Sequence, residues 1–261
     1  MNYLNWGAAS DCGRVRSVNE DSYLASPPVF VIADGMGGHA AGDVASRIAV
    51  DAFKQFVSRS AVAVSDALAG VEGANASILA SAGANGAMSG MGTTVTGLVR
   101  VMAAGADHWL VFNVGDSRVY RLSGGHLEQL TIDHSEAEEL VAEGKITREQ
   151  ARTYKRKNVV TRSLGTRPAP VADSWIFPCG IQERFIVCSD GLTNEVSDSE
   201  IEACAGSVRD PQSLAKELVS LAVVAGGRDN VTVIVVDSSE DPDDCGVEEN
   251  TAPRGILPEE G

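Results

Sequence analysis

Four aspartates occupy similar positions in the sequence, each at the edge of an apolar, β-branched run and close to glycine. They are Asp34, Asp116, Asp190 and Asp229. The run before the first of them, 29–33, is apolar throughout, which predicts a strand buried on both faces. A carboxylate at the end of such a strand must be paired, hydrogen-bonded or bound to a cation, because an isolated buried charge is very costly. If the four converge, their all-oxygen chemistry favours a hard cation such as Mg²⁺ or Mn²⁺ over zinc or copper.

A polar loop over residues 10–22 carries further charged groups, among them Arg16, Glu20 and Asp21. Charged residues on a loop are of more interest than those on a helix face, because loops tend to carry function. Each feature alone has a simpler interpretation, since an Asp-Gly after a strand is most often a turn. The combination of four such acids with this loop favours a site.

Composition limits the classes of function. The chain has 261 residues, 44% of them hydrophobic, and a formal net charge of −15, which disfavours nucleic acid or an anionic membrane as a partner. Its five cysteines contain no C-x-x-C pair, so neither a disulfide framework nor a zinc site is predicted. With no signal peptide pattern and no run of ~20 apolar residues, a cytoplasmic protein is expected.

Hydrophobic periodicity predicts a mixture of strands and helices. Strands are expected at 4–8, from about residue 23, and at 93–100, 109–114, 174–177, 185–188 and 231–236, with a hairpin of 119–122 and 126–130. Helical spacing covers 43–57, a segment through 64–78 that is weakened by two glycines, and a strong helix from Asp210-Pro211 to Gly226-Gly227. Residues 81–90 are predicted to be a loop.

Capping signals mark shorter helices. Ser135 is a predicted N-cap, and Thr147 with Gln150 and Ser197 with Glu200 are predicted capping boxes. Residues 131–166 are rich in charged side chains and show helical patterns, and they include the basic patch 155–157. This composition indicates a small surface subdomain, or flap. From residue 237 the chain is acidic and lacks an apolar pattern, which is typical of a disordered tail.

Taken together, the motifs resemble the bacterial branch of the metal-dependent serine/threonine protein phosphatases of type 2C. They occur in family order from about residue 5 to 237. The motifs are Arg16-x-x-Asn19-Glu20-Asp21, Asp34-Gly35-Met36-Gly37-Gly38-His39, Gly90-Met91-Gly92-Thr93-Thr94, Gly115-Asp116-Ser117-Arg118, Ser189-Asp190-Gly191 and Gly227-Arg228-Asp229-Asn230. Each is weak alone, but their order and spacing make the set specific.

The resemblance implies an α+β fold with a central antiparallel β-sandwich, flanked by helices on both faces in α-β-β-α layers, and a small helical flap. The phosphatase domain would span 1–238, with the flap at about 133–166, and the acidic tail 239–261. Two Mn²⁺ or Mg²⁺ ions are implied, and possibly a third ion in a weaker site. The implied ligands are Asp34 as the bridge, the Gly35 carbonyl, Asp190 and Asp229, with Asp116 for the third ion.

The resemblance also implies the chemistry. Arg16 would bind the substrate phosphate, and Glu20 and Asp21 would act through metal-bound waters. A metal-activated water would hydrolyse phosphoserine and phosphothreonine in proteins, opposing a bacterial Ser/Thr kinase, and the enzyme would be a monomer. Because no phosphoenzyme is needed, Cys188 is interpreted as a small buried core residue.

The sequence departs from the family pattern at two places. Eukaryotic members carry a histidine two residues after the bridging acid, where this chain has Met36. His39 lies three residues further on. It is either a general acid in place of that histidine or a surface residue with no such role. In the flap, Tyr154 to Lys157 replace the more usual His-Pro pairing, which leaves flap-based substrate preference open, and His134 is interpreted as structural.

Two other functions compete with this hypothesis. A catalytically inactive relative that binds a phosphoprotein or a kinase is the alternative, although such proteins typically lose a metal-binding acid and none is missing here. A two-metal nuclease conflicts with the net charge of −15, because a nucleic-acid substrate would be repelled.

Overall fold

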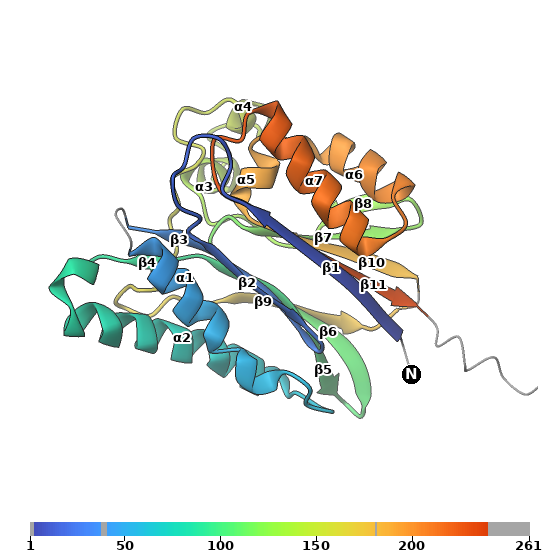
Figure 1. The fold of residues 1–261 in the computed structure, drawn as a ribbon, viewed down its shortest axis with the longest axis horizontal. Coiled ribbons are helices and arrows are strands. Elements are labelled where there is room, and N and C mark those ends of the chain that lie inside the picture. The colour runs from blue at the N-terminus through green and yellow to red at the C-terminus, as the bar shows by residue number, and fades with distance from the viewer. Residues whose placement is uncertain (1–2, 38–40, 181, 240–261) are drawn as a thin grey trace, which may run out of the picture.

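Two antiparallel sheets pack face to face at the centre of the molecule, with helices on both outer faces (Figure 1). The computed structural model describes residues 3–37, 41–180 and 182–239. One sheet has the strand order β1-β11-β10-β7-β8, and the other has β2-β3-β5-β6-β9 with β4 also paired to β3. The predicted α+β class and the α-β-β-α layers are confirmed.

The strands have these bounds. The first sheet contains β1 (Tyr3–Asp11), β7 (Arg118–Ser123), β8 (His126–Gln129), β10 (Glu183–Cys188) and β11 (Val231–Ser239). The second contains β2 (Asp21–Ser26), β3 (Val29–Met36), β4 (Gly92–Thr93), β5 (Val95–Ala103), β6 (Ala106–Val114) and β9 (Asp173–Pro178).

Strand β3 shows why its sequence is apolar without alternation. Its side chains alternate between two faces, and both faces are covered. Phe30 and Ile32 lie between the sheets with Phe185 and Ile234 of the other sheet. Val29, Val31 and Ala33 point outward into the layer formed with the helices. The prediction of a strand buried on both faces is therefore confirmed.

The helices form the outer layers. Helices α1 (Gly42–Asp51) and α2 (Val64–Ala84) cover the second sheet, and α6 (Asp198–Ser207) and α7 (Pro211–Ala225) cover the first (Figure 1). The shorter elements are α3 (Glu136–Ala142), α4 (Arg148–Arg152), α5 (Asp190–Thr193) and the 3-10 turns η1 (Lys54–Phe56) and η2 (Gly86–Met88). Among the described residues, none of these helices has the length and apolar composition that crossing a membrane requires.

The predicted caps are present. The Ser135 hydroxyl accepts from the Glu138 amide, and capping boxes begin α4 at Thr147 and α6 at Ser197. Helix α7 begins at the Asp210 cap and ends before Gly226, as predicted. The hairpin of β7 and β8 turns through Gly124 and Gly125, both with positive φ.

Several predicted boundaries are wrong. Strand β1 continues to Asp11 and β2 begins at Asp21, so the loop between them is shorter than predicted. Helix α1 ends at Asp51 rather than near residue 57. Helix α2 passes both glycines and reaches Ala84, into the segment predicted as a loop. A Cβ on Gly70 would lie 3.2 Å from the rings of Phe53 and Phe56, so this glycine lets the two aromatic rings pack against the helix.

Candidate metal centre

Asp21 and Asp34 lie opposite each other on adjacent strands. They are direct partners in the β2–β3 register, so their side chains point to the same face. Ser189 and Thr232, from the other sheet, both donate hydrogen bonds to Oδ2 of Asp21, at 2.8 and 2.7 Å. The other oxygen of Asp21, Oδ1, is buried without a hydrogen-bond partner in the described residues. Asp21 therefore connects the ends of the two sheets.

The backbone of Asp34 is fixed by two threonines. The Thr94 hydroxyl accepts from the Asp34 amide at 3.0 Å, and the Asp34 carbonyl accepts from the Thr93 hydroxyl at 2.8 Å and from the Thr94 amide at 2.9 Å. Both threonines come from the Gly-Met-Gly-Thr-Thr motif, to which sequence reasoning gave no role. They hold the bridging candidate in place through its main chain.

Gly35 is enclosed by backbone. A Cβ there would lie 2.2 Å from the Gly42 carbonyl oxygen and 2.7 Å from the Glu20 carbonyl oxygen. The Glu20 carboxylate in turn lies against Gly42 at the start of α1, where a Cβ would meet its Oε1 at 2.7 Å. Gly35 can therefore offer only its backbone to a ligand, and the two glycines allow Glu20 to sit beside it.

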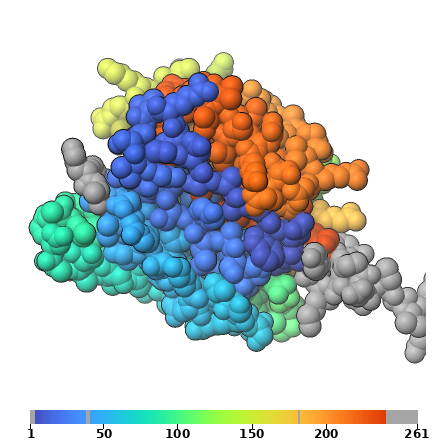
Figure 2. Space-filling view, in the orientation of Figure 1, coloured from blue at the N-terminus to red at the C-terminus, as the bar shows by residue number. Residues whose placement is uncertain are grey.

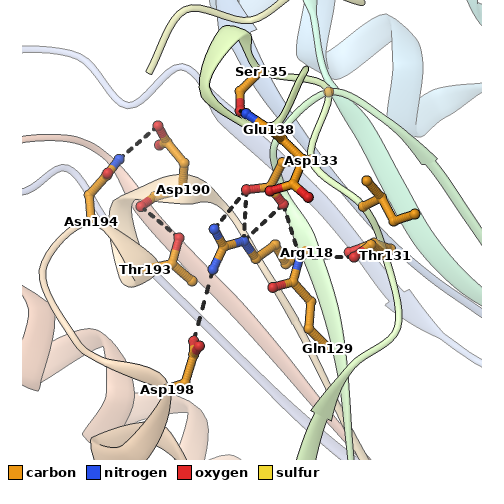
Figure 3. Close-up of polar contacts among 12 residues, drawn as sticks. Arg118, Gln129, Thr131, Asp133, Ser135, Glu138, Asp190, Thr193, Asn194 and Asp198 are labelled. Carbon is orange, nitrogen blue, oxygen red and sulfur yellow. Dashed lines mark hydrogen bonds and ion pairs between the residues drawn. The ribbon is translucent and has the colours of Figure 1, made fainter. Parts of the chain in front are cut away.

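Asp190 is the first residue of α5, a short helix that sequence reasoning missed. Asn194 donates from Nδ2 to Oδ2 of Asp190 at 2.9 Å, as Figure 3 shows. The remaining oxygen, Oδ1, is buried and has no hydrogen-bond partner among the described residues. The Asp34 carboxyl lies near enough to Asp190 to affect its pKa. Asn194 was not predicted, although its spacing of four residues on a helix places it beside Asp190.

Asp116 is held by the turn that precedes it. Gly115 has φ of +119°, and its amide donates to Nδ1 of His134 at 3.0 Å. Nε2 of His134 contacts Asp173 at 3.1 Å, so the ring is neutral with its proton on Nε2, and burial lowers its pKa. His134 thus connects the Asp116 turn to the segment that leads into α3, in agreement with the structural role predicted for it.

Asp229 and Arg16 form an ion pair. The Arg16 guanidinium donates to Oδ2 of Asp229 at 2.7 Å, and both side chains are at least one-third exposed. The structure therefore brings the two predicted residues together, but Arg16 faces a predicted metal ligand. This arrangement was not expected from the sequence.

Asn230 joins the loop of residues 12–20 to the start of β11. Its Oδ1 accepts from the Glu20 amide at 2.8 Å, and its Nδ2 donates to the carbonyls of Cys12 and Val18 at 3.0 Å each. Arg14 adds a backbone bond to Gly227 at 2.7 Å. Figure 2 shows this blue N-terminal segment packed against the orange C-terminal part of the chain. Asn230 lies in a predicted motif, but its role follows only from these contacts.

The pKa values show how closely the acids are grouped. Removal from water, followed by repulsion from neighbouring carboxylates, raises the pKa of Asp34 and Asp116 well above its ordinary value. The same two causes raise the pKa of Asp190 to about 6, and burial raises that of Asp21 to about 7. Asp229 contributes repulsion to Asp21, Asp34 and Asp190. The five acids are therefore electrostatic neighbours, although they are far apart in the sequence.

This donor set fits divalent cations. Oδ1 of Asp21 and Oδ1 of Asp190 receive no hydrogen bond from any residue that the structure describes, and the carboxylates repel one another. In the described part of the chain, however, no three acid, imidazole or thiol groups already stand close enough together to hold an ion as they are. One of the candidate carboxylates, that of Asp229, is paired with the Arg16 guanidinium in this structure.

Some predicted residues are not part of this description. His39 lies outside the described residues, as does the predicted tail beyond residue 239. Cys188 is fully buried beside the site, and burial raises the pKa of its thiol to about 12, which agrees with its interpretation as a core residue.

Comparisons with known proteins agree with the class indicated by the fold and the acid cluster, that of the metal-dependent protein phosphatases. A family model described as protein phosphatase 2C matches residues 12–219. The chain belongs to the protein phosphatase 2C family.

Individual relatives are bacterial. The chain is 36% identical to the serine/threonine phosphatase stp of Listeria monocytogenes over 87% of this chain and 93% of that protein. It is 38% identical to the serine/threonine protein phosphatase PstP of Mycobacterium tuberculosis, over 90% of this chain and 45% of PstP. The crystal structure of the PstP phosphatase matches with a TM-score of 0.85 at 34% identity, covering 92% of this chain and all of that one. A structure of its catalytic domain with two manganese ions matches with a TM-score of 0.83.

Proposed function

We propose that this chain hydrolyses phosphoserine and phosphothreonine in proteins at a binuclear Mn²⁺ or Mg²⁺ centre. The observation that carries the proposal is the cluster of five acids, brought together from five segments, with two buried carboxylate oxygens that lack a donor within residues 3–37, 41–180 and 182–239. The names of the relatives and the two manganese ions of the PstP structure support it.

We infer the following ligands. Asp34 would bridge two ions, the Gly35 carbonyl would bind one of them, and Asp190 and Asp229 would complete the other, with Asp116 beside a possible third. When bound, such ions lower the pKa of coordinated water and balance negative charge on phosphoryl oxygens. The oxygen-only donor set supports Mn²⁺ or Mg²⁺.

The chain's own residues supply the rest of the chemistry. Arg16 is proposed to bind the substrate phosphate, which a planar guanidinium can contact with two parallel hydrogen bonds. Its Nη2 pairs with Asp229 in this structure, so a movement of Arg16 away from Asp229 would free this carboxylate for an ion. Asp21 is proposed to accept a proton at Oδ1, because its Oδ2 is already engaged by Ser189 and Thr232. Glu20, beside Gly35, is proposed to orient water.

Hydrolysis is proposed to proceed without a phosphoenzyme. Cys188 directly precedes the motif of Asp190, but burial raises the pKa of its thiol to about 12, so it stays a thiol at neutral pH. We propose further that 1–238 is the catalytic domain with the flap at 133–166, that the chain acts as a cytoplasmic monomer, and that it opposes a bacterial Ser/Thr kinase. Cell fractionation tests the cytoplasmic location, and gel filtration tests the monomeric state. A phosphoproteome comparison after gene deletion tests whether the chain opposes a kinase.

The direct test is hydrolysis of p-nitrophenyl phosphate and of phosphothreonine peptides, with added Mn²⁺ or with EDTA. We expect activity with Mn²⁺, none with EDTA, and a loss of at least about a hundredfold in Asp190→Ala. Activity that survives chelation, or that persists in Asp190→Ala, would contradict the mechanism.

The alternative, an inactive phosphoprotein-binding relative of the same fold, predicts a different result. It would retain the fold but not bind the ions, so a calorimetric titration showing no Mn²⁺ binding would favour it. The full set of acids argues against it.

A further inference from the structure

Positive charge is concentrated in one segment of this acidic chain. Residues 145–162 contain seven lysines and arginines and one glutamate, whereas the whole chain has a formal net charge of −15. The segment includes α4 and the basic patch that the proposed chemistry does not use. Four of these bases pair with acids of the protein: Lys145, Arg148, Arg156 and Arg162. The charge that an anionic partner could meet is therefore that of the other three.

This basic segment forms one wall of a groove that begins at the metal centre. The groove has a volume of about 860 Å³. Asp116 and Asp190 line its inner end, Arg152 and Lys157 lie on the flap side, and the opposite wall is the segment 193–202. Figure 3 shows three of the residues that line the groove, Asp190, Arg118 and Asp133, lying close together. Any polypeptide that carries a phosphorylated residue to the metal centre through this groove passes between these walls.

The acids of the groove are largely satisfied by partners within the protein. Glu195 pairs with Arg228 at 2.8 Å and is only 3% exposed, Asp133 pairs with Arg118 at 2.7 Å, and Glu200 is held in the capping box of α6. The others contact neighbouring donors: Glu138 contacts Arg148, Asp198 contacts the Tyr120 hydroxyl, and Glu202 contacts the Leu127 amide.

The basic side chains on the flap wall differ from these acids in their pairing. The side chains of Arg152 and Lys157 form no hydrogen bond or ion pair with any described residue. The flap wall therefore offers positive charge that no acid of the described residues pairs, whereas Glu200 and Glu202 across the groove keep their negative charge, because they bond to neutral donors. An acidic segment that lies along the flap wall would gain two ion pairs there.

We propose that the flap wall selects phosphoprotein segments in which acidic residues flank the phosphorylated serine or threonine, through Arg152 and Lys157. This proposal rests on the proposed function, because the flap wall would bind the acidic segment only while the neighbouring phosphoresidue is held at the metal centre. Arg152 and Lys157 are specificity-determining residues and do not take part in hydrolysis.

The test uses the full chain loaded with Mn²⁺ and three substrates. They are a phosphothreonine peptide flanked by Asp and Glu, the same peptide with neutral flanks, and p-nitrophenyl phosphate, which is too small to reach the flap. In Arg152→Ala/Lys157→Ala we expect kcat/KM for the acidic peptide to fall about fivefold, as the loss of two exposed ion pairs implies. The other two substrates should keep their values. Added salt should reduce the native preference for the acidic peptide.

The matched control is Lys54→Ala/Lys216→Ala, which removes the same charge from η1 and α7, outside the groove. It should leave the preference for the acidic peptide intact. A native enzyme that prefers neutral or basic flanks, or a flap variant that loses activity equally on all three substrates, would overturn the proposal. Failure to hydrolyse even p-nitrophenyl phosphate would instead remove the proposed function, and this proposal with it. A peptide with a second phosphoserine in place of the acids should behave like the acidic one.

Discussion

Asp190, which we propose binds a cation, is oriented by a single neighbour. Asn194 engages Oδ2 and leaves the buried Oδ1 without a partner among the described residues. A side chain that orients a ligand in this way typically changes metal affinity by 10- to 100-fold when it is removed.

We therefore expect Asn194→Ala to weaken Mn²⁺ binding about tenfold, because Asp190 would lose its fixed orientation. Isothermal titration calorimetry measures this without relying on turnover. Asn158→Ala, an exposed amide that lines the same groove, is the control and should bind Mn²⁺ normally. Equal affinities for the native chain and Asn194→Ala would contradict the positioning role.

Asp21 has a pKa raised to about 7, mainly by burial, above its ordinary value of 3.8. A carboxyl whose pKa is higher in the folded than in the unfolded chain binds a proton on folding. Its contribution to stability is therefore present at pH below about 4 and is lost as the pH rises through about 7.

In EDTA, Asp21→Asn should stabilise the chain at pH 8 by on the order of 2 kcal/mol and have little effect at pH 4, because amide and protonated carboxyl are both neutral. Urea denaturation at a series of pH values measures the difference in the free energy of unfolding. A stabilisation by Asp21→Asn that is independent of pH would show that its carboxyl does not titrate in this range.

At the scale of elements, the site depends on contacts between segments that are remote in sequence. Helix α5 packs on the start of β11 so closely that a Cβ on Gly191 would lie 1.9 Å from the Asn230 carbonyl oxygen. The same short stretch carries Asp229 and anchors the loop of residues 12–20. The positions of Asp190, Asp229 and Glu20 are thereby coupled through backbone contacts.

We expect Gly191→Ala to destabilise the chain by about 2–3 kcal/mol and to weaken Mn²⁺ binding, because α5 and β11 must separate to admit the methyl group. Chemical denaturation and calorimetry measure the two effects. Gly206→Ala on α6 is the control, since a Cβ there meets nothing within 4 Å and should stabilise the helix slightly. Normal stability and affinity in Gly191→Ala would mean that the close approach is not required.

At the scale of the whole molecule, the two sheets bring together acids that repel one another at one end of the sandwich. The formal net charge of −15 adds to this repulsion. Cations that bind the folded chain alone would offset both effects and stabilise the fold by mass action.

We expect the melting temperature to rise when Mn²⁺ replaces EDTA, by the equivalent of about 2.7 kcal/mol at a hundred times Kd. Differential scanning calorimetry measures the shift. In Asp190→Ala the shift should shrink, while that variant in EDTA should be at least as stable as the native chain, because a repelling carboxylate is gone. An identical melting temperature with and without Mn²⁺ would argue against a metal centre.

The sequence alone predicted the buried strands and the helix caps, and through the family resemblance it predicted the layers and the candidate ligands. Buried strands such as 29–33 require apolar residues on both faces, and helix caps such as Asp210 are local contacts, so both leave a clear pattern. The acids at strand ends, with their glycines, gave the family resemblance in the same way. Element ends were less well predicted, because α2 continues past Gly70 only by packing against Phe53 and Phe56.

Only the tertiary structure decided how the site is held. Asn230, Ser189 and Thr232 act on residues about 40 to more than 200 positions away, and such contacts leave no periodic signal in the sequence. The same holds for the pairing of Arg16 with Asp229 and for the raised pKa of Asp21, which arise from burial and from neighbours brought together by folding. Residue type determines which ion pairs and titrations are possible. The size of each pKa shift and the choice of ion-pair partner depend on distances that exist only in the folded chain.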